Sequence, residues 1–259
     1  MNKLVTIFSL LIIIINCNAQ DDIWNGKKCA VVLTYDDCLN VHLDKVVPVL
    51  DSLGFKGTFY VQGNSYTLNK RMEDWREISK KGHELGNHTL FHPCTGDSVY
   101  RKWVETDYDL RYYSVRRIVD EIRTENVLLK AIDGKDKRTF AYTCGDKEAG
   151  DSNFTGLIQQ DFTGARSVAS RMEKFDEINL FDIGSYMMYN TTADSMINLV
   201  KQAEENNTLL VFLFHGVGGE HNLNVDLNEH NKLLYYLKQN EKDIWITSMV
   251  NLTEYIKVH

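Results

Sequence analysis

Short apolar runs with the length of β-strands alternate with helical patterns along most of this chain. The first run, residues 30–34, is rich in β-branched residues and predicts a buried strand. We expect strands at residues 30–34, 57–61, 139–142, 164–168, 209–214 and 244–247, and helices at residues 46–53, 73–81, 110–129, 193–205 and 229–239. Because strands and helices alternate, the predicted fold is α/β with a parallel sheet, closed or nearly closed into a barrel.

Length and charge limit the classes of protein that fit this pattern. The 259 residues carry a formal net charge of −7 and no basic run, which argues against a nucleic-acid partner. With only two prolines and no low-complexity stretch, the sequence offers no obvious linker. We therefore expect residues 20–259 to form one large domain that buries its core without covalent staples.

The N-terminus has the features of an export signal. Lys3 supplies a positive start, residues 4–15 form an apolar run, and Cys17-Asn18-Ala19 has the small residues of a cleavage site. The apolar run is too short for a comfortable membrane span. We expect residues 1–19 to be a signal peptide and the protein to be secreted or periplasmic without stable membrane insertion. Anchoring through a lipidated Cys17 is the alternative.

Several possible metal ligands follow apolar strands. Asp36 and Asp37 come directly after the first strand, His88 and His92 stand four residues apart, and His215 ends a long apolar run. In parallel barrels the working residues cluster at the carboxyl ends of the strands. Two neutral imidazoles and a carboxylate are common protein ligands of a catalytic zinc. The alternative interpretation is a turn or helix cap for the aspartates and a structural role for the histidines.

Four cysteines remain after the expected signal: Cys29, Cys38, Cys94 and Cys144. An even count in an exported protein permits disulfides but does not give their connectivity. The simplest interpretation is that these are small buried residues at strand ends. A Cys38–Cys94 or Cys94–Cys144 bridge is the alternative, and metal ligation is disfavoured because no Cys-x-x-Cys spacing occurs.

Three short segments resemble the motifs of a known family. Thr-Tyr-Asp-Asp at residues 34–37, His-Thr-Leu-Phe-His-Pro at residues 88–93 and Leu-Phe-His at residues 213–215 are similar to the first, second and fifth motifs of the polysaccharide deacetylases, carbohydrate esterase family 4. The resemblance runs from about Cys29 to Tyr255. It implies a distorted (β/α) barrel of about seven βα units, short of the eight of a regular barrel.

The resemblance also implies a role for each matched residue. Asp37, His88 and His92 would bind a divalent metal, with zinc preferred and cobalt or manganese as alternatives. A water molecule activated by that metal would be the nucleophile. Asp36 would be the base that takes its proton, and His215 the acid that protonates the leaving group, with acetate as the other product.

The third and fourth motifs depart from the family pattern. Where the family has Arg-Pro-Pro-Tyr-Gly, the aligned stretch reads Phe-Ala-Tyr-Thr-Cys-Gly. Ala141 therefore replaces the arginine that orients the base, and Cys144 takes the position whose backbone N–H serves the oxyanion. Arg166 or Lys147 could substitute for the arginine, although a surface role is the stronger expectation for each. Asp182 is the best candidate for the aspartate of the fourth motif.

The predicted function is a secreted metal-dependent deacetylase that acts on an acetylated oligo- or polysaccharide. N-deacetylation of a peptidoglycan- or chitin-like glycan and O-deacetylation of an acetylxylan-like glycan both remain open, as does the oligomeric state. The alternatives are a non-catalytic glycan-binding protein on the same fold, favoured by Ala141, and cleavage of a non-sugar amide. No motif supports a role for His221 or His230. Candidate sugar-binding aromatics, which core packing would equally explain, are Trp103, Tyr112, Tyr113 and Tyr186.

Overall fold

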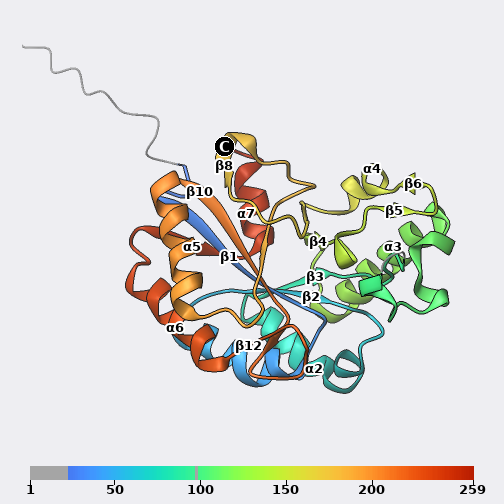
Figure 1. Ribbon diagram of the computed structural model, residues 1–259, viewed down its shortest axis with the longest axis horizontal. Coiled ribbons are helices and arrows are strands. Elements are labelled where there is room, and N and C mark those ends of the chain that lie inside the picture. Colours follow the sequence, from blue (N-terminus) through green and yellow to red (C-terminus); the bar gives the residue numbers. More distant parts are fainter. Residues whose placement is uncertain (1–22, 97–98) are drawn as a thin grey trace, which may run out of the picture.

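A curved sheet of mostly parallel strands forms the centre of the fold (Figure 1). The computed structural model describes residues 23–96 and 99–259, so the expected signal peptide and Cys17 lie outside the described residues. The strands of the sheet are β1 Cys29–Asp36, β2 Thr58–Val61, β3 Glu84–Asn87, β4 Phe140–Ala141, β7 Ala165–Arg166, β8 Glu173–Lys174, β9 Tyr186–Met187, β10 Thr208–Phe214 and β13 Ile244–Thr247. Their order is β7-β4-β3-β2-β1-β10-β8, with β13 paired to β1 and β9 to β10.

The central strand β1 pairs along both of its edges. One edge pairs with β10 over residues 30–35, and the other pairs first with β13 and then with β2. These pairings are parallel, whereas β8 runs antiparallel to β10. No strand pairing within the described residues joins β7 to β8, so the sheet is a curled half-barrel. The predicted distorted α/β barrel is confirmed, and full closure by strand pairing is not reached.

Helices pack around the sheet, most of them on its outer face (Figure 1). They are α1 Val47–Leu53, α2 Tyr66–Lys80, α3 Val115–Asp133, α4 Thr155–Ile158, α5 Ala193–Asn206, α6 Leu227–Gln239 and α7 Met249–Ile256. α5 packs on α6, α6 on α1, and α2 on α3. None of the helices in the described residues is both long and apolar enough to cross a membrane.

Serine caps decide where several helices begin. Ser65 accepts a hydrogen bond from the Thr67 backbone N–H, so α2 begins earlier than its apolar pattern predicts. Ser114 caps α3 in the same way, and α3 therefore begins later than expected. The sequence pattern does not predict α7, which starts after the capping residue Ser248. The expected strands at residues 139–142 and 164–168 shorten to the two-residue strands β4 and β7.

Alternation along β1 divides the core into two layers. Val31 and Leu33 pack between the sheet and the outer helices. Ala30 and Val32 pack on the inner side of the curled sheet, together with residues of α7. Because successive side chains of a strand point to opposite faces, Asp36 at the end of β1 faces the interior.

Candidate active site

The two aspartates sit where β1 ends and the chain turns sharply. Asp36 is the last residue of the strand and is only 3% exposed. Asp37 and Cys38 both have left-handed backbone conformations, with φ of 75° and 55°. Such values are uncommon for residues with a side chain and cost free energy, so surrounding contacts must hold this turn. The turn gives the adjacent carboxylates different surroundings.

The histidine pair lies on a tight turn after β3. Asn87 accepts a hydrogen bond from the Thr89 backbone N–H, and its side-chain amide donates to the backbone oxygen of Ile122 in α3. The Thr89 hydroxyl then accepts from the His92 backbone N–H. Thr89 and His92 have φ of 63° and 53°. The two histidines are therefore brought together by a hydrogen-bonded turn and not by a helix, as Pro93 suggested.

Asp37, His88 and His92 present one ligand atom each to a common point, with these atoms all within 4.8 Å of one another. Asp37 Oδ1 lies 3.6 Å from His88 Nε2 and 3.5 Å from His92 Nε2. This oxygen is buried and has no hydrogen-bond partner in the described part of the chain. A buried carboxylate oxygen without a partner is costly, and a cation between the three groups would satisfy it.

His88 is oriented as a metal-binding histidine would be. Its Nδ1 donates to the backbone oxygen of Ala141 at 2.9 Å, which leaves the lone pair on Nε2, facing Asp37. Burial lowers the pKa of His88 to about 4, so the imidazole is neutral at pH 7. Burial acts to raise the pKa of Asp37, but the surrounding histidines outweigh it and hold that pKa below its ordinary value. The donor set and its protonation states fit a divalent metal.

Asp36 has a different partner. Arg166 Nη2 lies 2.5 Å from Asp36 Oδ2, and both side chains are buried. Arg166 is on β7, directly opposite Ala141 of β4 in the strand register. The arginine beside Asp36 therefore comes from β7, the strand next to β4, where the third motif would have placed it. The expectation of a surface role for Arg166 is wrong, because this residue is fully buried.

Lys147, the other possible substitute for the arginine, and Asp182, the candidate for the fourth-motif aspartate, pair with each other and not with Asp36 or Asp37. Lys147 Nζ pairs with Asp182 at 2.5 Å, and Asp182 also lies 3.5 Å from Arg171. Asp182 therefore belongs to a partly exposed ion-pair group.

Two histidines face the other oxygen of Asp37. His215, the residue after β10, places Nε2 3.9 Å from Asp37 Oδ2, and His221 places Nε2 3.6 Å from the same atom. Their rings stack at 4.8 Å with an interplanar angle of 14°. Burial lowers the pKa of His215. The sequence offered no motif for His221; the signal is the glycine-rich stretch after His215, which folds the chain back.

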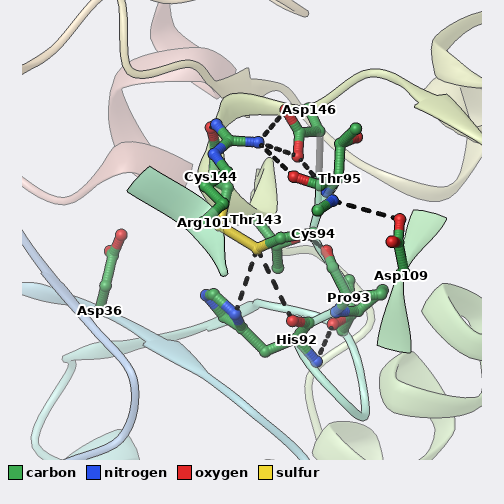
Figure 2. The surroundings of a disulfide bond; sticks show 12 residues. Asp36, His92, Pro93, Cys94, Thr95, Arg101, Asp109, Thr143, Cys144 and Asp146 are labelled. Atoms are coloured by element: carbon green, nitrogen blue, oxygen red, sulfur yellow. Dashed lines mark hydrogen bonds and ion pairs between the residues drawn. A yellow bond between two sulfur atoms is a disulfide. The ribbon is translucent and has the colours of Figure 1, made fainter. Parts of the chain in front are cut away.

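One of the two disulfides left open by the sequence is present. Cys94 and Cys144 are bridged, with 5.8 Å between their Cα atoms, and Cys29 and Cys38 are buried free thiols. Figure 2 shows the bridge beside the His92 ring, whose Nδ1 lies 3.6 Å from Cys94 Sγ. Because both sulfurs are in the disulfide, neither is available as a thiolate ligand. The bridge ties together the loops after β3 and β4.

An arginine reinforces the same junction (Figure 2). Arg101 donates to both carboxylate oxygens of Asp146 and to the backbone oxygen of Cys144. Cys144 itself has a left-handed backbone, with φ of 54°. The backbone at Cys144, the residue predicted to serve the oxyanion, is thereby fixed, and its side-chain sulfur lies within 4.8 Å of a ring nitrogen of His92.

A cleft of about 890 Å³ opens beside these groups. Its lining includes Asp37, His92, His221 and Trp103. Trp103 is 60% exposed, whereas Tyr113, another sugar-binding candidate, is a core residue with 3% exposure. Tyr112 is exposed but does not line the cleft. A cleft of this volume accommodates a ligand the size of a short oligosaccharide.

Comparison with known proteins identifies the family. The fold is a curled (β/α) barrel, and its carboxylate and histidine cluster lies at the carboxyl ends of the strands. Enzymes with (β/α) barrels have their active sites at this end. Residues 25–153 match the family model described as polysaccharide deacetylase. The chain belongs to the polysaccharide deacetylase family. The matched residues include the aspartate pair, the histidine pair and Cys144, whereas Arg166 and His215 lie beyond them.

Solved structures show the same fold. A candidate polysaccharide deacetylase from Mycobacterium smegmatis superposes with a TM-score of 0.61 at 14% identity, covering 90% of this chain and 91% of its own. PdaA of Bacillus subtilis, a family 4 carbohydrate esterase, gives a TM-score of 0.57 at 16% identity over 88% of this chain and 82% of its own. BA3943 of Bacillus anthracis is described as a pseudoenzyme of carbohydrate esterase family 4. It gives a TM-score of 0.52 at 14% identity, covering 88% of this chain and 66% of its own.

Curated relatives are matched over only a small part of their length. The uncharacterized protein YlxY of Bacillus subtilis is 39% identical over 54 residues, which are 21% of this chain and 16% of that protein. A gellan lyase from a Bacillus species is 23% identical over 193 residues, which are 74% of this chain and 7% of that protein.

Proposed function

We propose that this protein is a secreted, metal-dependent deacetylase that hydrolyses acetyl groups from a carbohydrate. The observation that carries the proposal is the buried Asp37 Oδ1, which has no hydrogen-bond partner in residues 23–96 and 99–259 and lies near the Nε2 atoms of His88 and His92. The three residues would hold the metal. The cleft of about 890 Å³ that reaches this point gives a glycan access to it.

The chain's own groups divide the proton transfers between them. A divalent metal at this position would polarise the acetyl carbonyl and make a water molecule more acidic. Asp36, with Oδ2 held by Arg166 and Oδ1 buried without a hydrogen-bond partner among the described residues, would accept the proton of that water. His215, on the other side of Asp37, would give a proton to the departing amine or alcohol. The backbone N–H of Cys144 would stabilise the oxyanion.

The substrate class follows from the cleft and from the relatives. PdaC of Bacillus subtilis, which shares the fold with a TM-score of 0.51 at 15% identity, is described as a peptidoglycan deacetylase. Exposed Trp103 along the cleft offers a flat apolar surface on which a sugar ring can stack. An extracellular or periplasmic glycan is therefore the proposed substrate, in keeping with the apolar N-terminal run. N-acetyl and O-acetyl groups present the same carbonyl to this site.

Acetate release tests the proposal. Purified protein is assayed on acetylated xylan, chitooligosaccharides and peptidoglycan after metal removal and after restoring zinc, cobalt or manganese. We expect release only with metal present, and none from Asp37→Ala under any condition. Release that persists in the metal-free protein, or in Asp37→Ala, would refute the metal site.

A second candidate function is glycan binding without catalysis. Ala141 stands at the position of the family's third-motif arginine. BA3943, a protein with a similar fold, is described as a pseudoenzyme. The buried Arg166–Asp36 pair argues against this candidate, because it supplies a guanidinium to the base from another strand. Glycan binding with full metal occupancy and no acetate release from any of the three substrates would favour the binding protein.

A further inference from the structure

The two oxygens of Asp37 have separate surroundings. Oδ1 faces His88 and His92, the proposed metal ligands, at 3.6 Å and 3.5 Å. Oδ2 faces His221 at 3.6 Å and His215 at 3.9 Å. If Oδ1 binds the metal, the position of Oδ2 decides how the carboxylate is rotated. A group that holds Oδ2 would therefore set the geometry of the metal site.

Of the two histidines that face Asp37 Oδ2, only His221 makes a hydrogen bond in the described residues that defines which ring nitrogen carries the hydrogen. Its Nδ1 accepts a hydrogen bond from the Leu223 backbone N–H at 3.0 Å. In the neutral ring the hydrogen must then be on Nε2, the atom nearest Asp37 Oδ2. His221 can thus donate to Asp37, but its Nε2 has no lone pair for a metal. This arrangement is the reverse of His88, whose Nδ1 donates and whose Nε2 is free to bind.

His215 is less suited to this task. Its Nε2 is the more distant of the two from Asp37 Oδ2. Its Nδ1 is buried and has no hydrogen-bond partner among the described residues, so no contact defines which nitrogen carries the hydrogen. The ring of His221 stacks on the ring of His215, so the two side chains hold each other in orientation.

The loop that carries His221 is built to place it. A Cβ atom at Gly216 would lie 2.4 Å from the backbone oxygen of Gly219 and 3.2 Å from His221 Cβ, so only glycine permits the chain to fold back here. The short strands β11 Gly216–Val217 and β12 Asn224–Val225 pair across the base of the loop. The backbone on both sides of His221 is therefore held in place.

The same loop is tied to the turn that follows Asp37. Glu220 accepts hydrogen bonds from the Asn40 side chain at 2.9 Å and from the Val41 backbone N–H at 2.7 Å. Lys45 donates to the backbone oxygen of Gly218 at 2.5 Å. These contacts couple the residues just before His221 to the segment that follows its proposed partner, Asp37.

We propose that His221 is a positioning residue that holds Asp37 Oδ2 through its Nε2–H, so that Oδ1 is presented to the metal. This inference rests on the proposed metal site. The separation of 3.6 Å is longer than a hydrogen bond, and it would close by a small rotation of the carboxylate when the metal is bound. His221 then acts on the metal through Asp37, as outer partners of metal ligands do.

Zinc affinity of the metal-free protein, measured by competition with a chromogenic chelator, tests this role without any activity assay. Loss of an outer partner typically weakens metal binding by about 10–100-fold, and we expect His221→Ala to fall in that range. His221→Phe keeps the ring stacked on His215 but removes the donor, and should weaken binding equally. His221→Gln places an amide N–H near the original Nε2, and should stay within about threefold of the unchanged protein.

Asn222→Ala is the matched control, since Asn222 lines the same cleft next to His221 and should leave zinc affinity unchanged. Circular dichroism establishes that each variant is folded. Unchanged affinity in both His221→Ala and His221→Phe would overturn the inference. If His221→Gln bound zinc as weakly as His221→Ala, the donor role of His221 would be wrong. If the unchanged protein bound no zinc, the proposed metal site would fail first, and this inference with it.

Discussion

Arg166 and Asp36 form a buried ion pair across 130 positions of the chain, with Nη2 2.5 Å from Oδ2. The guanidinium also lies over the Tyr60 ring at 5.0 Å, and its other nitrogen, Nη1, is 3.4 Å from the Ser185 hydroxyl. Charge, stacking and burial therefore fix the arginine in one orientation. Asp36, the proposed base, is therefore held by Arg166 of β7, whereas the third motif lies on the neighbouring strand β4.

Arg166→Met tests this pair. Removing one partner leaves the Asp36 carboxylate buried without a counter-charge, and we expect the free energy of unfolding to fall by about 3–5 kcal/mol. Acetate release should fall as well. Urea unfolding and the acetate assay measure the two effects. Asp36→Asn combined with Arg166→Met should lose less stability than the two single variants added together. Strict additivity would show that the pair is not coupled.

Asp36→Asn separates the base from the metal ligands. The amide keeps the shape of the carboxylate but cannot accept the proton, and loss of a general base costs about 10²–10⁴-fold in rate. Zinc affinity should remain close to that of the unchanged protein, because Asp37 and the histidines are intact. Chelator competition and acetate release give the two readings. An Asp36→Asn protein that keeps its full rate would exclude Asp36 as the base.

The Cys94–Cys144 bridge should stabilise both the fold and the site. It closes a segment with a sequence separation of 50, for which a contribution of about 2–4 kcal/mol is typical. We expect reductant, or the double change Cys94→Ala and Cys144→Ala, to lower the melting temperature and to weaken zinc binding through the adjacent His92. Thermal unfolding with and without reductant measures the first effect. Reductant should change nothing further in the double variant, and a shift there would point to another cause.

Stability should fall in mild acid. Burial lowers the pKa of His42 and of His230 to about 4, from an ordinary value of 6.5. Between pH 6.5 and 4 the unfolded chain therefore binds protons that the folded chain does not, and the free energy of unfolding decreases as the pH falls. Each histidine contributes at most about 1.4 kcal/mol per pH unit.

Urea unfolding of the metal-free protein at pH 7, 5.5 and 4.5 measures this slope. His230→Gln removes one of the two groups and should make the slope shallower. His259→Ala changes an exposed histidine and should leave it as it was. A slope that is identical in all three proteins would remove His230 as its source.

Trp103→Ala tests the cleft as a glycan site. Loss of an exposed stacking surface should raise KM about tenfold on a chain of several sugars, which corresponds to about 1.4 kcal/mol. The rate at saturation should change little, because a stacking surface contributes to binding and takes no part in proton transfer. Tyr112→Ala, an exposed aromatic outside the cleft, serves as the control. An unchanged KM for Trp103→Ala on long and short substrates would exclude stacking there.

Local features of the sequence determined much of the architecture. The apolar runs at residues 30–34 and 209–214 are the cores of β1 and β10, and the amphipathic patterns at residues 193–205 and 229–239 are α5 and α6. Burial of apolar side chains and hydrogen bonds within one helix act between residues close in sequence, so periodicity predicts them. The aspartate and histidine motifs were visible for the same reason, since each is a few consecutive residues.

Tertiary structure decided which distant groups meet. Nothing near Arg166 in the sequence indicates that its strand lies beside β4, or that its side chain reaches Asp36. The choice between two possible disulfides, and the approach of His221 to Asp37, depend likewise on how strands and loops pack. Such contacts arise only when the sheet curls and brings strand ends together, and periodicity does not encode which strands become neighbours. The sequence by itself determined the motifs and most of the longer strands and helices, while the order of strands in the sheet determined the partner of each motif residue.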